Sequence, residues 1–361
     1  MKLHLVGGFL GSGKTTAIIH AAQALMDQGL QVGVITNDQG KYLVDTAFFR
    51  LADLPAVEVS GGCFCCNYDD LDARLAQLIQ TSHPDVIFAE SVGSCADIIA
   101  TVVKPLLDLG ANGVKPDSFS VFSDARMLRR RLNEQEMPFS EDVVYIYDKQ
   151  IEEAGMIIVN KIDLLAEPAR EEVQRLLVAK FPSTPYLMQS SLSQAGVQPW
   201  LEQIQSGNLQ LPEAALEINY QRYGAGEAQL AWFDVEMAIS FPENQGRALL
   251  RLALRRLLED LAAQKAGIGH LKFILSGSGV MTEGSAMKIS FPTLEEPGWE
   301  ERIPEIHGTQ AALLVNARVE MAAEALRTLV QSALVESGIN LQLDDGMAFH
   351  PAEPKPTHRY P

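Results

Sequence analysis

The first sixteen residues constrain this chain most, because they contain a glycine-rich loop of the kind that wraps a phosphate group. Residues 3–6 form an apolar run that predicts a short buried strand, and residues 15–26 predict a helix. This strand–loop–helix order is the context that the motif G-x-x-x-x-G-K-[ST] requires. The residues that fit the motif are Gly8, Gly13, Lys14 and Thr15.

Such a loop binds phosphate because its backbone N–H groups turn toward the ligand and the following helix adds the positive end of its dipole. Lys14 can reach the β- and γ-phosphates as a catalytic cation, and the Thr15 hydroxyl can bind Mg²⁺. The residues expected to hold the nucleotide phosphates are Gly8, Gly11, Ser12, Gly13, Lys14, Thr15 and Thr16.

Composition narrows the class of protein further. The 361 residues are enough for two or three domains, and 47% of them are hydrophobic, which is enough for a sizeable core. A formal net charge of −17 argues against nucleic-acid binding, which needs clustered cations. No apolar run approaches the roughly 18 residues of a membrane span, and the first run stops at Gly7, too early for a secretory leader. We therefore expect a cytoplasmic protein without nucleic-acid or membrane partners.

Strand and helix patterns alternate over residues 1–205, and several strands are continuous apolar runs, as in strands covered on both faces. This pattern predicts an α/β fold, a doubly wound and mostly parallel sheet of the P-loop NTPase type. The expected strands are Leu3–Gly7, Gln31–Thr36, Val57–Val59, Asp85–Glu90, Phe119–Asp124, Gly155–Asn160 and Pro185–Gln189.

The rest of the chain predicts a second, smaller domain. Residues 206–228 predict a linker, and residues 229–349 have the order β-α-β-β-α-β, which predicts an α+β ferredoxin-like domain. Its third strand is ambiguous between Met287–Phe291 and Ala311–Val319. Residues 350–361 contain four prolines and predict a flexible tail.

The string Asn160-Lys161-Ile162-Asp163 predicts which base the pocket binds. It ends an apolar strand, so its side chains emerge at the carboxyl edge of the sheet. A carboxylate at Asp163 can accept from N1–H and the exocyclic amine of guanine, whereas adenine would leave it unpaired. Asn160 and Lys161 would brace the loop and stack on the base; the alternative is a polar turn. Ser190 could back the base from the other side, with a helix N-cap as its alternative.

Two further strand ends carry acidic candidates. Glu90 begins Glu90-Ser91-Val92-Gly93, where P-loop enzymes place a carboxylate for the Mg²⁺ shell and a glycine whose N–H contacts the γ-phosphate. We expect Glu90 to bind Mg²⁺ with Thr15 and to act in catalysis, and Gly93 to contact the nucleotide. Asp38 is a candidate for organising metal or water, with an ordinary Asx turn as the alternative.

Three of the four cysteines, Cys63, Cys65 and Cys66, lie within four residues and directly after two glycines. Clustered thiols argue against a disulfide framework and favour a soft or borderline ion such as Zn²⁺, Co²⁺ or Cu⁺. Adjacent cysteines cannot easily face one ion, so Cys63 and Cys65 are the expected pair, with the third thiol close by. A fourth ligand could be Cys95, Glu58, a histidine or water. The alternative for the cluster is a set of buried small hydrophobes.

Together, these motifs resemble those of the CobW-like P-loop metal-chaperone GTPases, relatives of the urease and hydrogenase nickel-insertion GTPases. The resemblance covers the first 205 residues well and extends loosely to about residue 349. It implies a slow GTPase that uses GTP, GDP and Mg²⁺ and binds a transition metal at Cys63, Cys65 and Cys66, Zn²⁺ foremost and Co²⁺ or Ni²⁺ as alternatives. It further implies GTP-gated delivery of the metal to a client metalloprotein, with the second domain serving client or homodimer contacts.

The chain departs from the family pattern in three places. Asn37-Asp38-Gln39-Gly40-Lys41 stands where the family usually has Asn-Glu-Phe-Gly-Glu, no His-rich run is present, and Cys95 is additional. The competing hypothesis is a regulatory protein whose nucleotide-bound form docks on a metallo- or corrinoid-enzyme and protects or reactivates it. In that hypothesis the thiols are structural.

Overall fold

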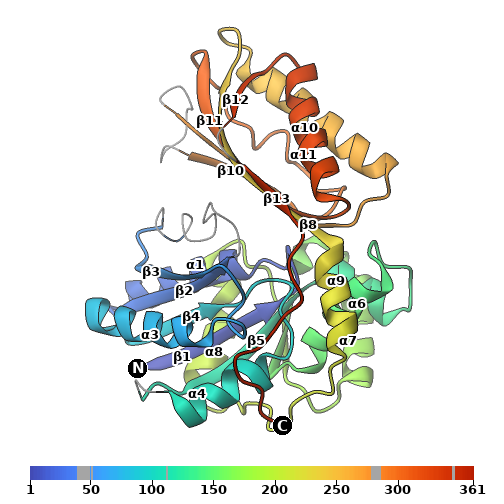
Figure 1. The fold of residues 1–361 in the computed structure, drawn as a ribbon. Helices are drawn as coiled ribbons and strands as arrows, with labels where there is room; N and C mark the ends of the chain where they lie inside the picture. Colours follow the sequence, from blue (N-terminus) through green and yellow to red (C-terminus); the bar gives the residue numbers. More distant parts are fainter. Residues whose placement is uncertain (39–48, 50–51, 111–112, 278–285, 344–345) are drawn as a thin grey trace. The chain divides into compact units, whose positions relative to one another are not determined.

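The computed structural model describes residues 1–361 except 39–48, 50–51, 111–112, 278–285 and 344–345 (Figure 1). The described chain divides into two compact units, each with its own sheet. Of the described residues, unit 1 comprises those up to Gly224 together with Glu353–Pro361, and unit 2 comprises those from Ala225 to Ala352.

Unit 1 is built on a seven-stranded sheet with the order β3-β2-β4-β1-β5-β6-β7, in which every neighbouring pair is parallel. The apolar runs seen in the sequence form strands of this sheet. Their side chains are apolar on both faces because helices cover both faces of a parallel sheet. All seven predicted strands are present, with ends that agree to within three residues. The strands are β1 (Lys2–Gly8), β2 (Val32–Asp38), β3 (Ala56–Ser60), β4 (Val86–Glu90), β5 (Pro116–Asp124), β6 (Met156–Asn160) and β7 (Tyr186–Met188).

One face of this sheet packs against α1 (Lys14–Asp27) and α8 (Gln194–Ser206), in a core that includes Trp200. The Trp200 ring lies edge-on to Phe122 with 5.1 Å between ring centroids, and its Nε1 donates to Ser120 Oγ at 3.0 Å. The other helical elements of unit 1 are α3 (Tyr68–Ser82), η1 (Ile99–Val103, one π-helical turn), α4 (Lys104–Leu109), α5 (Ala125–Leu132), α6 (Glu141–Glu152), η2 (Ile162–Leu164) and α7 (Glu167–Lys180).

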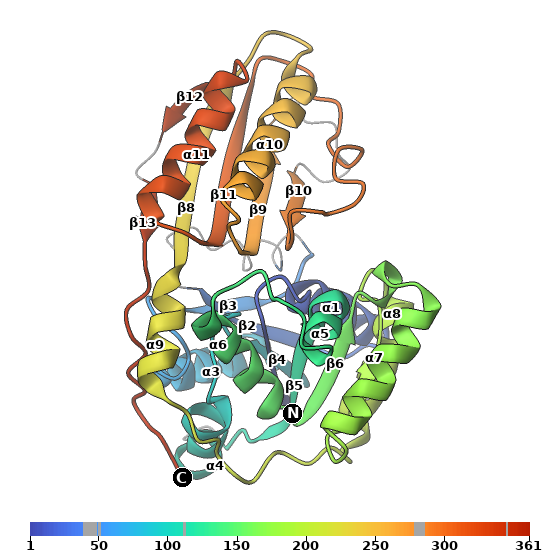
Figure 2. The ribbon, with the colours of Figure 1, turned by 90° about the vertical axis from the view of Figure 1, so that its right-hand side faces the viewer.

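Unit 2 is an antiparallel sheet with the order β10-β9-β11-β8-β12, and β13 also pairs with β8 (Figure 2). Strands β8, β9, β11 and β12 with two helices follow the predicted β-α-β-β-α-β order. Both candidates for the ambiguous strand form, as β10 and β11. The elements are β8 (Leu230–Ser240), α10 (Gly246–Ala263), β9 (Ile268–Ser276), β10 (Ala286–Phe291), β11 (Gln310–Glu320), α11 (Ala323–Glu336), β12 (Asn340–Leu343) and β13 (Met347–Phe349).

Two segments differ from their expected character. The stretch expected to be a linker ends in a helix, α9 (Tyr220–Gln229), because Tyr223 is buried there and its hydroxyl accepts from Ala96 N–H at 3.0 Å. The tail expected to be flexible is hydrogen bonded to unit 1 from Lys355 to Tyr360. Among the described helices, none has the length and apolarity needed to cross a membrane.

His4, on β1, makes the stability of unit 1 depend on pH. It is 1% exposed, and its Nδ1 lies 2.9 Å from Ser118 Oγ. Burial, with a smaller effect of the Lys2 charge, lowers the pKa of His4 from 6.5 to about 4. The unfolded chain therefore binds a proton that the folded chain rejects, and stability falls as pH drops from 6.5 toward 4, by up to about 3 kcal/mol.

We expect His4→Gln to remove this part of the pH dependence. Chemical unfolding of both proteins between pH 7.5 and 4.5 measures it, and the difference in unfolding free energy between them should shrink as pH falls. A constant difference across this range would contradict the assignment to His4.

Candidate nucleotide and metal site

The functional candidates of unit 1 gather at one edge of the sheet because parallel strands present their carboxyl ends together. β1 ends at Gly8, β4 at Glu90 and β6 at Asn160. Asp38 is the last residue of β2, where its backbone pairs in register with Ser60. The three residues that follow it in the departure from the family pattern, 39–41, lie outside the described residues.

The phosphate loop requires glycine for two separate reasons. Gly8 and Gly13 have φ angles of 121° and 93°, which favour glycine, and Gly11 has 70°. There is also no space for a side chain: a Cβ on Gly8 would lie 2.1 Å from Phe122 O, and one on Gly13 would lie 2.4 Å from Asn160 Nδ2. The phosphate loop therefore packs directly against β5 and β6, with no room for a side chain at Gly8 or Gly13.

The side chains that begin α1 point back into the loop. Lys14 is buried and its Nζ donates to Gly8 O at 2.8 Å, while Thr15 Oγ1 donates to Glu90 Oε1 at 2.9 Å. A hydroxyl beside a carboxylate supplies the hard oxygen ligands that Mg²⁺ prefers, so these residues fit that ion. Ser12 Oγ is buried and has no hydrogen-bond partner within the described part of the chain, which leaves it available to a phosphate oxygen. Thr16 is half-buried.

Asn160 and Lys161, which follow β6 in the segment predicted to bind the base, hydrogen bond to the phosphate loop. Asn160 Nδ2 donates to Ser12 O at 2.8 Å, and Lys161 Nζ donates to Gly11 O at 2.6 Å. Asn160 Oδ1 accepts the Ser191 N–H at 3.1 Å and the Ser191 hydroxyl at 2.8 Å. Ser191, next to the predicted Ser190, thus holds Asn160, and the role of Ser190 beside the base stays a prediction.

Asp163 and Asp124 complete this side of the site. Asp163 lies in η2 with an exposed side chain, which leaves its carboxylate open to a ligand. Asp124 Oδ2 lies 3.2 Å from Lys161 Nζ and 2.7 Å from Arg126 Nη2. Burial alone would raise the pKa of Asp124, but the hydrogen bonds from Arg126 and the charges of Lys161 and Arg126 hold it below its ordinary value. The ionised Asp124 therefore orients Lys161.

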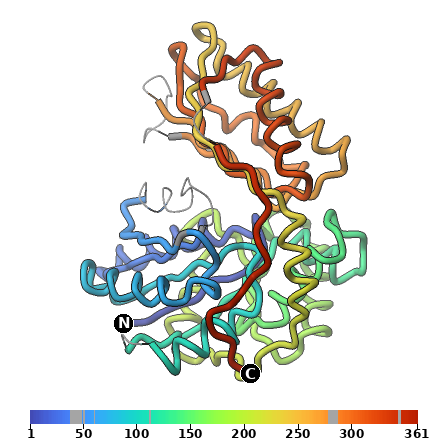
Figure 3. Tube along the Cα trace, viewed as in Figure 1, coloured from blue at the N-terminus to red at the C-terminus, as the bar shows by residue number. Residues whose placement is uncertain are grey.

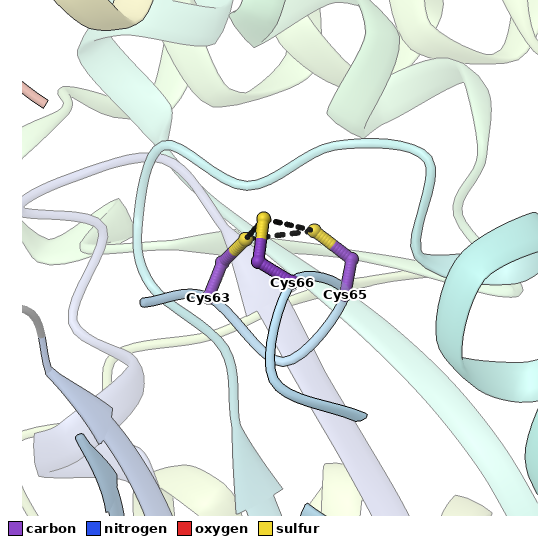
Figure 4. Close-up of side chains that lie close together, drawn as sticks. All are labelled: Cys63, Cys65 and Cys66. Atoms are coloured by element: carbon purple, nitrogen blue, oxygen red, sulfur yellow. Dashed lines mark hydrogen bonds between the residues drawn. The ribbon is translucent and has the colours of Figure 1, made fainter. Parts of the chain in front are cut away.

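The second part of the site is a cluster of three sulfur atoms on the loop after β3 (Figure 4). Cys63 Sγ lies 2.7 Å from Cys65 Sγ and 2.9 Å from Cys66 Sγ, and the other pair is 3.7 Å apart. In a tetrahedral zinc site with Zn–S bonds near 2.3 Å, sulfur atoms are about 3.8 Å apart. Three converging sulfur atoms are a donor set that zinc takes, and the two short distances would open by about 1 Å around a bound ion.

All three thiols converge, in agreement with the expected pair Cys63 and Cys65 and a third thiol close by. The reason is a tight turn in which Cys63 O accepts from the N–H groups of both Cys66 and Asn67 at 3.0 Å. This turn brings Cys66 back beside the first cysteine. Among the described residues, the group of mutually close ligand atoms comprises these three cysteines, and Cys95, Glu58 and the histidines are not part of it.

The cluster favours one thiolate among protonated thiols. Hydrogen bonds from Cys65, Cys66 and Cys95 hold the pKa of Cys63 well below its ordinary value. The hydrogen bond to Cys63 raises the pKa of Cys65, and it raises the pKa of Cys66 to about 11. Cys63 is therefore the most acidic of the three thiols.

The segment after β4 links the two parts of the site. Gly93 packs so closely on the phosphate loop that a Cβ there would lie 2.7 Å from Leu10 Cδ2. Two residues later, the buried Cys95 hydrogen bonds to Cys63 through its thiol. Gln150, from α6, holds this segment by donating from Nε2 to Gly93 O at 3.0 Å and to Cys95 O at 2.8 Å.

Asn37 is a positioning residue that the sequence does not single out. It lies near the end of β2, and its Nδ2 donates to Val59 O at 3.0 Å and to Gly62 O at 2.6 Å. Its Oδ1 accepts from Phe64 N–H at 2.8 Å. One buried amide thus fixes the thiol loop on both sides of Cys63. An asparagine at a strand end is the only local signal, and it does not reveal these three partners.

The fold and this edge of the sheet define a P-loop NTPase-like protein with a neighbouring thiol cluster. Residues 2–186 match the family model described as CobW/HypB/UreG, nucleotide-binding domain. The chain therefore belongs to the CobW/HypB/UreG family.

Named relatives agree with this family. The chain is 30% identical to the zinc chaperone YeiR of Escherichia coli (strain K12) over 48% of this chain and 50% of that protein. It is 25% identical to the zinc chaperone CobW of Sinorhizobium sp over 52% of this chain and 58% of that protein. It thus spans about half the length of the curated relatives it matches. Among solved structures, Helicobacter pylori HypB in complex with nickel is 14% identical, with a TM-score of 0.43 over 59% of this chain and 92% of that chain.

We expect Asn37→Ala to loosen the thiol loop. The change removes three hydrogen bonds and leaves their buried backbone partners unsatisfied, which should cost about 3 kcal/mol of unfolding free energy. Urea unfolding measures this loss. Asn133→Ala is the matched control, since the side chain of Asn133 is only half-buried, its bonds go to Arg129 O and to the Glu172 carboxylate near the surface, and its loss should cost about 1 kcal/mol or less. Equal losses in the two variants would contradict the role of Asn37.

Proposed function

We propose that this chain is a GTP-binding and GTP-hydrolysing metallochaperone that holds Zn²⁺ at Cys63, Cys65 and Cys66 and delivers it to a client metalloprotein. The observation that carries the proposal is the segment after β4, which packs on the phosphate loop at Gly93 and hydrogen bonds to the thiol cluster through Cys95. The family and its relatives named as zinc chaperones support the choice of nucleotide and metal. We further propose that it works in the cytoplasm and that unit 2 contacts the client or a second copy.

In this proposal the nucleotide is held from both ends. Lys14 and the N–H groups of the phosphate loop neutralise and orient the β- and γ-phosphates, and Thr15 and Glu90 supply oxygen ligands to Mg²⁺. When bound, Mg²⁺ stabilises the charge that develops on the phosphates. Asp163 accepts from N1–H and the exocyclic amine of guanine. Asp38 is proposed to organise water or metal from the end of β2.

Metal and nucleotide would influence each other through Gly93 and Cys95. The Cys63 thiolate is the first ligand, and Cys65 and Cys66 join it as they lose their protons to solvent on metal binding. Cys95 is proposed as the fourth ligand, because its thiol already hydrogen bonds to Cys63. A shift of Gly93 with the γ-phosphate would then move a metal ligand two residues away.

Asp163→Asn tests the base. The variant loses a charged acceptor for two guanine N–H groups, so we expect GTP affinity to fall by about a hundredfold. Titration of a fluorescent GTP analogue measures this fall. Glu171→Gln, an exposed change of the same charge on α7, should leave the affinity unchanged. Wild-type preference for ATP over GTP would refute the guanine assignment.

The coupling is tested by measuring Zn²⁺ affinity with a non-hydrolysable GTP analogue and with GDP. Linkage requires that any factor by which GTP changes Zn²⁺ affinity is matched by the factor by which Zn²⁺ changes GTP affinity. We expect roughly a five- to hundredfold difference between the two nucleotide states. Identical Zn²⁺ affinities in both states would remove the gating.

Cys65→Ser separates this proposal from a purely structural role of the thiols. We expect the variant to lose tight Zn²⁺ binding while its unfolding free energy without metal changes by about 1 kcal/mol or less. Retained Zn²⁺ affinity, or a large loss of stability without metal, would favour structural thiols.

A further inference from the structure

The last residues of the chain lie on the thiol loop. We call Glu353–Pro361 the strap; it runs beside α9 and ends near α4 (Figure 3). Lys355 N–H donates to Cys66 Sγ at 3.3 Å, and Thr357 N–H donates to Cys65 O at 2.8 Å. The Thr357 hydroxyl also donates to Cys66 O at 3.0 Å. The strap therefore contacts one sulfur atom and two carbonyl groups of the metal-binding loop.

A second set of contacts fixes the strap to the segment that follows Cys95. Arg359 Nε donates to Asp97 Oδ2 at 2.7 Å, and Tyr360 N–H donates to Ala100 O at 2.9 Å. Asp97 is 1% exposed, and its Oδ2 also accepts the Tyr220 hydroxyl at 2.7 Å. A buried carboxylate needs a counter-charge, so Arg359 contributes more here than an exposed ion pair would.

The strap ends on α4. The Tyr360 hydroxyl donates to Asp108 Oδ2 at 2.8 Å, and Lys104 Nζ donates to the backbone oxygen of Pro361. The His358 ring lies edge-on to the Tyr68 ring, with 5.0 Å between centroids, at the start of α3. His358 and Tyr360, the residues on either side of Arg359, thus each contact a different helix of unit 1.

The sequence of the strap is suited to this position. Pro354 and Pro356 have no N–H and hold φ near −65°, so they favour an extended chain. The residues that follow them, Lys355 and Thr357, keep their N–H groups, and these two are the donors to the thiol loop. Prolines also lower the conformational entropy that the free segment would lose on docking.

The two sets of contacts belong to the two segments that carry the four cysteines. One is the loop with Cys63, Cys65 and Cys66, and the other is the segment from Cys95 to Ala100. We propose that the strap clips these two segments together over the thiol cluster and slows both access to the thiols and release of a soft metal ion bound there. The part about metal release rests on the proposed function above.

The strap can open without unfolding unit 1. It contributes no strand or helix to the fold, and its Arg359 side chain is 39% exposed. Segments held by a few partly exposed hydrogen bonds open locally at low cost. Opening removes the N–H donor from Cys66 and the counter-charge from Asp97, and so frees both segments together.

The experiment uses full-length Arg359→Ala and Thr357→Pro variants. Thr357→Pro removes both donors of Thr357 and leaves Asp97 paired, so it separates strap opening from destabilisation by an unpaired carboxylate. Arg129→Ala is the matched control, because Arg129 Nε makes a 2.6 Å ion pair with Glu172 on another face and is 42% exposed. Urea unfolding verifies that the proteins are folded.

The first readout is the rate at which iodoacetamide alkylates the cysteines of the metal-free proteins, followed by mass spectrometry. We expect both strap variants to react about tenfold faster than wild type at the thiol cluster, foremost at Cys63, the most acidic of the three thiols, and Arg129→Ala to match wild type. The second readout is transfer of bound Zn²⁺ to a coloured chelator, which should be faster in the same variants and by a similar factor.

Unchanged alkylation rates in both strap variants would overturn the proposal. Faster alkylation with unchanged Zn²⁺ transfer would overturn the part concerning metal release. If wild type binds no Zn²⁺, the proposed function fails, and the alkylation rates still test whether the strap covers the thiols.

Discussion

The carboxyl edge of one parallel sheet is the constraint on which the site depends. Because seven strands run in the same direction, the phosphate loop, Glu90, Asn160 and the thiol loop all begin where a strand ends. Side-chain hydrogen bonds then connect these elements to one another. Asn160 joins the base side to the phosphate loop, and Thr15 joins that loop to Glu90. The candidate nucleotide pocket and the thiol cluster thus lie at the same edge of one sheet.

The segment from Glu90 to Ala100 connects the two candidate ligand sites, because Glu90 and Gly93 lie at the phosphate loop and Cys95 lies at the thiol cluster. Gln150 holds its first half, and Glu153 accepts the Ile99 N–H at 3.3 Å at its far end. Burial raises the pKa of Glu153 well above its ordinary range, so this carboxyl group adds little charge beside Asp97. Asp97 itself has a φ of 66°, a conformation that aspartate tolerates better than most residues. This segment is therefore held at several points along its length.

Much of the fold can be predicted from local patterns. The seven strands of unit 1 are predictable because buried parallel strands are apolar runs, and the order of unit 2 follows from its helical periodicity. The ambiguous pair of strands cannot be resolved from sequence, since both segments have strand character and both pair with β9. The contacts of the tail cannot be predicted from sequence either, because a proline-rich composition predicts an extended chain but does not show which surface that chain packs against.

The sequence by itself determined the chemistry of this protein: a glycine loop for phosphates, a string that suits guanine, and three clustered thiols. These signals are local, since each depends on residues close together in the chain. The tertiary structure alone decided the partners: Ser191 on Asn160, Asn37 across the thiol loop, and Arg359 on Asp97. Such contacts join residues up to 262 positions apart, and their geometry depends on strand register and on how loops pack. The local sequence pattern carries no information about strand register or loop packing, so these contacts are known only from the folded structure.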